Sequence, residues 1–303
     1  MSAETITPDT QARSLAERLP QPLRDYALLA RFDRPIGFWL LFWPCTWGLW
    51  LTGAGLHWAL ALWFLLGAIA MRSAGCVYND IVDADLDKSV ARTANRPIAS
   101  GRVSRRAAWV WLVALSFVGL IVLLQLRPSA QLVALGSVLL VAAYPFMKRI
   151  TWWPQAWLGL VFNWGVLVGW TAMRDDALGV MLAIYAGAAC WTIGYDTIYA
   201  LQDREDDALV GIKSSALRMG GRVKSGVAIF YVLAIALWSL AFWMLRSDWL
   251  ALLALSPAAV HLAWQVLSLD PANADNPLAR FRSNHFAGAL VAAACLIVGN
   301  AGA

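Results

Sequence analysis

Apolar residues form long blocks along this chain, and shorter polar or charged segments separate them. Nine blocks can be read, at about residues 35–52, 58–80, 107–126, 130–146, 155–173, 178–202, 223–245, 248–268 and 285–302. A helix of roughly 20 apolar residues is long enough to cross the hydrocarbon core of a bilayer. The pattern therefore predicts an all-α membrane protein with nine transmembrane helices.

The segments between the blocks differ strongly in length and charge. The loops at 81–106 and 203–222 are long and charged, whereas the loops that follow odd-numbered blocks are tight. Of the 24 Lys and Arg residues, 20 lie in the N-terminal segment and the even-numbered loops, and three lie in the odd-numbered loops. Because basic loops stay on the cytoplasmic side of a membrane, we expect the N-terminus and both long loops there and the C-terminus outside.

The composition agrees with a membrane protein and argues against nucleic-acid binding. Of the 303 residues, 60% are hydrophobic and 14% are charged, whereas soluble domains carry about 25% charged residues. Basic loops that face anionic lipid account for the net charge of +5. We therefore expect membrane lipid, and no nucleic acid, as a partner.

Two acidic segments lie at corresponding ends of predicted helices. Residues three or four apart share a helix face, which groups Asn79 with Asp83 and Asp87. The second face consists of Asp196, Tyr199, Asp203 and Asp207. A single acidic cluster beyond a span is most often a solvated helix end, but two clusters in matching register are harder to explain in that way.

The spacing of the two segments indicates a weak internal repeat. Asp83 lies 120 residues before Asp203, and Asp87 lies 120 residues before Asp207. Each segment is followed by a long basic loop and then by another apolar block. We therefore predict a single transmembrane domain with two related halves. The predicted bounds are 1–23 for a polar N-terminal tail and 24–303 for the domain, with halves at about 24–150 and 151–303.

Carboxylates this close together repel one another unless a cation lies between them. Magnesium prefers oxygen ligands and bridges one or two carboxylates to substrate phosphates. We therefore predict a Mg²⁺ site whose ligands are Asn79, Asp83, Asp87, Asp203 and Asp207.

Basic residues on the same side of the membrane complete this hypothesis. Magnesium with Lys and Arg forms a clamp for a diphosphate, and the candidates are Arg96, Lys148, Arg149 and Lys213. The chain has no Walker loop, GxGxxG motif or catalytic triad, so nucleotide chemistry is not indicated. A diphosphate with an apolar tail suits the mouth of an apolar helix bundle, and we therefore expect a polyprenyl diphosphate.

These motifs resemble the UbiA superfamily of intramembrane prenyltransferases. The NDxxDxxxD motif of that family matches Asn79, Asp80, Asp83 and Asp87, and its DxxxD motif matches Asp203 and Asp207. Further similar strings are RPIGFWLLFWPCTWGLW, RSAGCVYND, RTANRP, YPFMKR and GIKSSA. The resemblance covers about residues 30–300 and favours the branch of the family that acts on 4-hydroxybenzoate.

The resemblance implies a fold and a reaction. The fold is nine helices around a central cavity, with the two long loops as a cap. The reaction is magnesium-dependent transfer of a polyprenyl chain from polyprenyl diphosphate to the ring carbon ortho to the hydroxyl of 4-hydroxybenzoate, in ubiquinone biosynthesis. The implied catalytic residues are Asp83, Asp87, Asp203 and Asp207, with Tyr144 and Asp196 as softer candidates.

Four further candidates concern the acceptor and the carbocation. Asp196 and Tyr199 lie deeper than the metal face and are candidates to orient the acceptor. Tyr144 is a candidate to stabilise the allylic cation, or else an interfacial tyrosine. Arg72, the one basic residue deep inside a predicted span, either binds the acceptor carboxylate or pairs structurally with an acid.

Two other functions and one location complete the expectations. A sibling prenyltransferase with another aromatic acceptor would share the metal motifs, and a secondary transporter would also place acids at a repeat interface. The N-terminal segment has Glu4, Asp9 and Glu17 and few basic residues, unlike a typical mitochondrial presequence. We expect the protein in the inner membrane of a bacterium.

Overall fold

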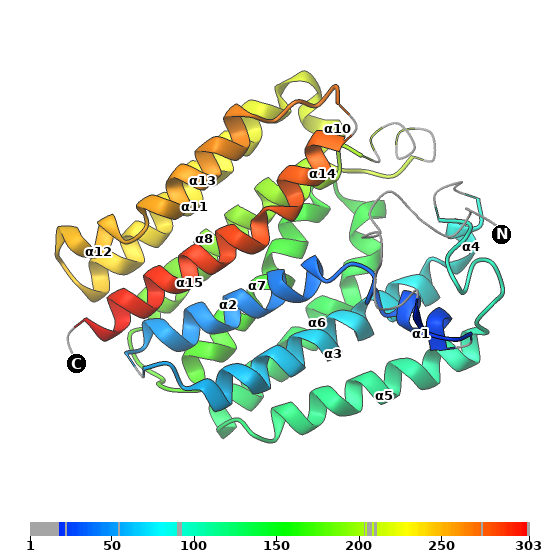
Figure 1. Ribbon diagram of the computed structural model, residues 1–303, viewed down its shortest axis with the longest axis horizontal. Helices are drawn as coiled ribbons and strands as arrows, with labels where there is room; N and C mark the ends of the chain where they lie inside the picture. The colour runs from blue at the N-terminus through cyan, green and yellow to red at the C-terminus, as the bar shows by residue number, and fades with distance from the viewer. Residues whose placement is uncertain are drawn as a thin grey trace. The chain divides into compact units, whose positions relative to one another are not determined.

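Helices account for the regular secondary structure of the part of the chain that the computed structural model describes (Figure 1). That part comprises residues 18–21, 23–53, 55–89, 93–202, 204, 208, 211–273 and 275–301. No β-strand occurs among these residues, so the predicted all-α class is confirmed. The α-helices are α1 Leu23–Leu29, α2 Ile36–Leu51, α3 Trp58–Val82, α4 Ala84–Asp87, α5 Arg105–Leu123, α6 Pro128–Ile150, α7 Pro154–Thr171, α8 Leu178–Tyr199, α10 Ser215–Met219, α11 Val223–Leu245, α12 Trp249–Leu253, α13 Ser256–Leu267, α14 Asp275–Arg282 and α15 Asn284–Asn300, and a 3₁₀ helix, η2, covers Gly220–Arg222.

Seven helical segments within the described residues are long and apolar enough to cross a membrane. They are Trp58–Val82, Arg105–Leu123, Pro128–Ile150, Leu178–Tyr199, Ser215–Leu245, Trp249–Leu267 and Asp275–Asn300. Each of the nine predicted blocks contains helix, but α2 and α7 are not among these seven segments. Helix α2 has only 16 residues. Helix α7 has 18 residues and carries the polar residues Gln155 and Asn163. The chain is therefore a membrane protein with several spans.

Large apolar side chains on the outer faces of the helices support this assignment. Val110 on α5 is 71% exposed, and Leu132 and Leu139 on α6 are 72% and 78% exposed. Soluble proteins rarely expose apolar surface on this scale. In a bilayer the lipid tails cover it, so these positions indicate the lipid-facing side of each helix.

The described helices belong to two compact units of the chain. The first unit comprises residues 1–39 and 65–125, and the second comprises residues 40–64 and 126–303. In the first unit, α1, the C-terminal part of α3 and α5 share a small apolar core. Its buried members include Leu29, Val77, Ile81, Ala108 and Leu115.

Glycines allow a close backbone contact in the second unit, between α2 and α7. A Cβ atom at Gly169 would overlap the carbonyl oxygen of Cys45 and lie 2.9 Å from the amide nitrogen of Leu49. A Cβ atom at Gly48 would likewise overlap the carbonyl oxygen of Val166. Small residues that let helix backbones touch are the usual way for helices to associate in lipid, where the hydrophobic effect contributes little.

Tryptophan side chains fill the centre of the second unit. The rings of Trp47, Trp191 and Trp238 are fully buried, and the centroid of Trp47 lies 5.2 Å from that of Trp191 and 5.3 Å from that of Trp238. The indole nitrogen of Trp47 donates to the carbonyl oxygen of Gly288 at 2.9 Å. The three indoles thereby join α2, α8, α11 and α15 into one packed body.

Candidate active site

The first acidic segment lies where α3 gives way to the short helix α4. Helix α3 ends at Val82, and Asp83 interrupts it with φ −91° and ψ 4°. Backbone bonding nevertheless continues with helical spacing, because the amide of Asp83 donates to Asn79 O at 2.9 Å and the amide of Asp87 donates to Asp83 O at 2.8 Å. Asn79, Asp83 and Asp87 therefore follow one another at one-turn intervals, as the spacing predicts.

Three carboxylates of this segment are buried. Asp80 is 1% exposed, Asp83 is 0% exposed and Asp87 is 5% exposed. By contrast, Asp85 points to solvent and pairs with Arg105 at 2.6 Å. A solvated helix end would expose all of its acids. The buried acidic face therefore favours a binding site over a solvated helix end.

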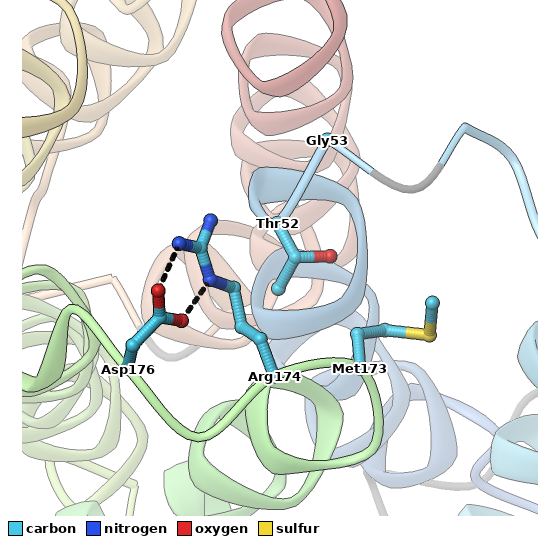
Figure 2. Close-up of a pocket in the computed structure, with 5 residues that line it drawn as sticks. All are labelled: Thr52, Gly53, Met173, Arg174 and Asp176. Carbon is cyan, nitrogen blue, oxygen red and sulfur yellow. Dashed lines mark hydrogen bonds and ion pairs between the residues drawn. The ribbon is translucent and has the colours of Figure 1, made fainter.

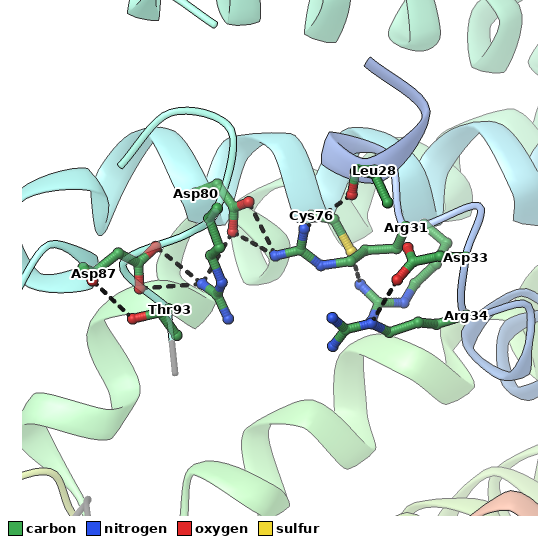
Figure 3. A network of polar contacts seen from close by, with 10 residues as sticks. Leu28, Arg31, Asp33, Arg34, Cys76, Asp80, Asp87 and Thr93 are labelled. Atoms are coloured by element: carbon green, nitrogen blue, oxygen red, sulfur yellow. Dashed lines mark hydrogen bonds and ion pairs between the residues drawn. The ribbon is translucent and has the colours of Figure 1, made fainter. Parts of the chain in front are cut away.

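Two arginines pair with two of the three buried acids, Asp80 and Asp87 (Figure 3). Arg96 Nη1 lies 2.9 Å from Asp87 Oδ2 and 3.1 Å from Asp80 Oδ1. Arg31 Nη2 donates to both carboxylate oxygens of Asp80, at 2.8 and 2.9 Å. Thr93 adds a hydrogen bond to the backbone carbonyl of Asp87 at 2.9 Å. The predicted substrate contact Arg96 thus lies at the first acidic segment.

The acids and bases of this network perturb one another. Burial raises the pKa of the Asp87 carboxyl; Arg96 opposes this shift, and the nearby charges of Asp80 and Asp83 add to it. Burial lowers the pKa of Arg31, but the charges of Asp80 and other neighbours outweigh burial, so the pKa of its guanidinium is raised. Asp87 therefore carries unfavourable like-charge interactions that a further cation would relieve.

The donor set of this segment fits a magnesium ion that is completed by other ligands. Within the described residues, three or more acidic, histidine or cysteine side chains do not gather closely enough to hold a metal ion. Magnesium, however, is usually held by one or two carboxylates together with substrate phosphates and water. Asp83 and Asp87 would supply two such carboxylates, and the other predicted acidic ligands, Asp203 and Asp207, lie outside the described residues.

The second acidic segment is described only where it leaves α8. Asp196 and Tyr199 are partly buried in the last turn of α8. The ring of Tyr199 packs on Phe281 of α14, with 4.6 Å between centroids. Both predicted acceptor residues therefore lie directly before the acidic segment, and their roles stay predictions.

Three buried hydrogen bonds anchor the chain that follows this segment. Ser215 N donates to Gln155 Oε1 at 3.0 Å, and Thr197 Oγ1 lies 2.6 Å from Ser215 Oγ. Thr197 Oγ1 also contacts Ile193 O at 2.6 Å. The buried side chains of Gln155, Thr197 and Ser215 thus form a hydrogen-bonded clamp. This clamp joins the start of α7, the end of α8 and the start of α10.

Four predicted site residues of the second unit gather around the end of α6. Tyr144 and Lys148 are partly buried and Arg149 is exposed in the last two turns of α6. Lys213 follows this helix end closely, because its amide donates to Lys148 O at 3.1 Å and its Nζ donates to Ile150 O at 3.2 Å. Tyr144, Lys148, Arg149 and Lys213 thus come from one region, and their roles stay predictions.

Arg72 lies two turns before Asn79 on α3. Its guanidinium contacts Cys76 Sγ, one turn further along the helix. A Cβ atom at Gly37 would lie 2.6 Å from Arg72 Nε, so the glycine leaves the room that the guanidinium occupies. This placement inside α3 agrees with the position that the sequence predicts, and the choice between acceptor binding and a structural role stays open.

The sequence analysis did not predict Arg31 as a site residue, nor the ion pair that Arg31 forms with Asp80. Arg31 and Asp80 are 49 residues apart and meet only through the turn between α1 and α2. No repeat or motif in the sequence links the two positions. The one signal available was the position of Asp80 inside the acidic motif, where its neighbours suggested a metal ligand.

A separate pocket of about 360 Å³ lies at the tight loops of the second unit (Figure 2). Its lining residues are Thr52, Gly53, Met173, Arg174 and Asp176. Arg174 Nη2 donates to Asp176 Oδ2 at 2.7 Å, and this contact lowers the pKa of the Asp176 carboxyl. None of the predicted site residues lines this pocket, so it is not the predicted active site.

The fold and the site together define a helical membrane protein with buried acids and arginines at the end of a span. The model of the UbiA prenyltransferase family matches residues 41–294. The chain therefore belongs to the UbiA prenyltransferase family.

Relatives of this family with similar sequences are enzymes of animals and plants. The chain is 42% identical over 284 residues to a protein of Homo sapiens named "4-hydroxybenzoate polyprenyltransferase, mitochondrial", covering 92% of this chain and 76% of that one. Proteins of the same name from Caenorhabditis elegans and Arabidopsis thaliana are 43% and 42% identical. The alignments cover 92% and 90% of this chain and 80% and 68% of those proteins.

Solved structures share the fold. A UbiA homologue from Aeropyrum pernix superposes with a TM-score of 0.71 at 23% identity, covering 86% of this chain and 97% of that one. A UbiA homologue from Archaeoglobus fulgidus bound to GPP and Mg²⁺ gives a TM-score of 0.64 at 19% identity, covering 90% of this chain and 99% of that one. At this identity the likeness establishes the fold alone.

The expected location in a bacterial inner membrane is wrong. The relatives with which the chain aligns are named as mitochondrial enzymes. The physical reason for the error is that the apolar blocks report the thickness of a bilayer and not its identity. The acidic residues near the N-terminus were given too much weight.

Proposed function

We propose that this protein transfers a polyprenyl chain from polyprenyl diphosphate to 4-hydroxybenzoate, with magnesium as cofactor. The observation that carries the proposal is the buried acidic face at the end of α3, where Asp83 and Asp87 lie beside Arg96. It is supported by the names of the relatives, which align over most of this chain. A place in ubiquinone biosynthesis follows from the chemistry of that acceptor.

The reaction is the replacement of one bond by another at C1 of the prenyl chain. The bond between C1 and the diphosphate oxygen breaks, and the ring carbon ortho to the hydroxyl forms a bond to C1 and then loses its proton. Magnesium, when bound, would neutralise the diphosphate and make it a better leaving group. Asp83 and Asp87 would hold the ion together with Asn79, and Asp203 and Asp207 would do so from the second segment.

The residues of this chain do the binding and positioning. Arg96 would contact the diphosphate, because a guanidinium forms strong charge-assisted hydrogen bonds with phosphate oxygens. Lys148, Arg149 and Lys213 would add charge from the end of α6. The apolar interior excludes water, which would otherwise capture the cationic carbon. Tyr144 offers an aromatic face to that carbon.

The acceptor needs a cation and an orienting group. A benzoate beside a carboxylate-rich site is unfavourable without a partner, and Arg72 inside α3 is the candidate. Asp196 and Tyr199 would orient the ring or its hydroxyl from the end of α8. These three assignments rest on position in the helices.

The same proposal extends to the fold in the membrane. Besides the seven candidate spans, α2 and α7 would supply the other two of nine transmembrane helices. Helix α7 is 18 residues long, about 27 Å at 1.5 Å per residue, which is close to the thickness of the hydrocarbon core. The helices would surround a central cavity capped by the loops at 81–106 and 203–222.

An acceptor panel tests the proposed function. Purified protein is supplied with magnesium, a long prenyl diphosphate and one aromatic compound at a time, and products are identified by mass spectrometry and NMR. We expect prenylated 4-hydroxybenzoate and far less product from its neutral amide. A different preferred aromatic acid would assign the chain to a sibling reaction, and absence of any prenylated product would refute the proposal.

A further inference from the structure

Arg31 lies in a helix-terminating turn that usually contains glycine. After α1, the amide of Phe32 donates to Ala27 O at 3.0 Å and the amide of Arg31 donates to Leu28 O at 3.1 Å. This pair of bonds is a Schellman motif, and its left-handed residue is Arg31, with φ +61°. A left-handed conformation is unfavourable for a residue with a Cβ atom and persists where surrounding contacts impose it.

The side chain of Arg31 supplies those contacts. Its Nη2 donates to both oxygens of Asp80, at 2.8 and 2.9 Å, and its Nη1 donates to Leu28 O at 3.1 Å. Figure 3 shows Arg31 between Leu28 at the end of α1 and Asp80 on α3. Asp80 is 1% exposed. A glycine would suit the backbone better, so the sequence keeps an arginine here at a conformational cost.

Asp80 also binds Arg96, so it links Arg31 to Arg96. Its Oδ1 accepts from Arg96 Nη1 at 3.1 Å, and the same nitrogen reaches the carboxylate of Asp87 at 2.9 and 3.1 Å. These three hydrogen bonds all come from Arg96 Nη1. Asp80 and Asp87 together therefore set the orientation of the guanidinium at the first acidic segment.

We propose that Arg31 and Asp80 are positioning residues that hold Arg96 for the diphosphate, and that Asp80 is not a metal ligand. Arg31 and Arg96 both engage the Asp80 carboxylate, whereas among the described residues Arg96 alone pairs with that of Asp87. A metal on Asp80 would have to displace both guanidinium groups and would leave two partly buried cations without this partner, which is unfavourable. This inference rests on the proposed function, because it takes a prenyl diphosphate as the ligand of Arg96.

Binding of a non-cleavable prenyl thiolodiphosphate, measured by calorimetry at saturating magnesium, tests the proposal without turnover. Arg31→Gly keeps the glycine-type turn and removes the side chain, so we expect binding at least about tenfold weaker. Asp80→Asn should have a similar effect. Arg31→Lys, which keeps one cationic nitrogen, should lose less. The double variant should be no weaker than the poorer single variant, because both changes disrupt the same contact.

Arg105→Gln provides the matched control. Arg105 pairs with Asp85 on the exposed side of the same acidic segment, at 2.6 Å, so removing its charge should leave the affinity unchanged. Thermal unfolding of every variant separates loss of binding from loss of folding. If Arg31→Gly does not fold, Arg31→Lys and Asp80→Asn decide the question.

Three results would overturn parts of the account, and they differ from one another. If the single variants Arg31→Gly and Asp80→Asn both bind the analogue with wild-type affinity, the positioning pair is refuted. If Arg31→Gly does not fold, wild-type affinity in both Arg31→Lys and Asp80→Asn has the same meaning. Recovery of Asp80→Asn at higher magnesium, with Arg31→Lys unaffected, would make Asp80 a metal ligand. Failure of the wild-type protein to bind the analogue with magnesium would instead refute the proposed function.

Discussion

Replacement of Gln155 by alanine should loosen the chain that follows the second acidic segment. Gln155 Oε1 accepts the hydrogen bond of the Ser215 amide at 3.0 Å. Gln155 is 5% exposed and Ser215 is 0% exposed, so water cannot readily replace the lost acceptor. A buried N–H group without a partner costs about 1–3 kcal/mol.

This free energy converts into a measurable change in local opening. If the lost bond acts on the segment around Lys213, the open population rises by about fivefold to more than a hundredfold. Lys213 is held on α6 through Lys148 O and Ile150 O, so trypsin reaches the bond after Lys213 only when the segment opens. Limited trypsinolysis in detergent, followed by mass spectrometry, measures the rate of that cleavage.

The control for this experiment is Gln125→Ala. Gln125 is exposed, and its side-chain amide donates to Ile121 O, one turn earlier in the chain, at 3.3 Å. Its removal should leave the cleavage after Lys213 at the wild-type rate. If Gln155→Ala also cleaves at the wild-type rate, the bond between Gln155 and Ser215 does not anchor this segment and the reasoning fails.

Two further predictions concern packing and pH. Gly169→Ala should destabilise the protein by about 1–3 kcal/mol, because the new methyl group would overlap the backbone of Cys45. In Gly75→Ala the new methyl group meets nothing within 4 Å, so this variant should be as stable as the wild type or more stable. Equal melting temperatures for the two variants would contradict this. Hydrogen bonds from the Ala251 amide and Arg246 lower the pKa of Asp248 in the folded protein. The charged carboxylate therefore stabilises the fold fully above its ordinary pKa of about 3.9. This contribution is lost as the pH falls through the lowered pKa of the folded protein. The difference in melting temperature between wild type and Asp248→Asn should therefore shrink below about pH 4, and a constant difference down to pH 2 would refute the assignment.

Much of the fold could be predicted from the sequence, because each apolar block is long enough to fix a helix by itself. The block at 248–268 shows the limit of that approach. It forms two helices, α12 and α13, with Pro257 in the first turn of α13. A proline there ends the preceding helix, yet it hardly changes the hydropathy on which the prediction depended.

The candidate site was predictable where it is local in sequence. The common face of Asn79, Asp83 and Asp87 follows from helical spacing, and it persists across the interruption at Asp83. The contact of Arg31 with Asp80 depends on a left-handed turn and a distance of 49 residues in the chain. Contacts of that kind are set by tertiary structure, and spacing rules do not reach them.

The clamp of Gln155, Thr197 and Ser215 escaped prediction for the same reason. Its members come from three helices and are ordinary polar residues within apolar or loop sequence. What the sequence showed was the GIKSSA string, and the resemblance that it carried gave no hint of hydrogen bonds to α7 and α8.

The most direct test of the central claim compares two neighbouring acids of the first acidic segment. Asp83 is 0% exposed on the predicted metal face, whereas Asp85 is solvent-facing and paired with Arg105. Turnover of 4-hydroxybenzoate with magnesium should fall on the order of a hundredfold or more in Asp83→Ala and stay near the wild-type rate in Asp85→Ala. Near-normal turnover in a folded Asp83→Ala protein, or an equal loss in both variants, would contradict the account.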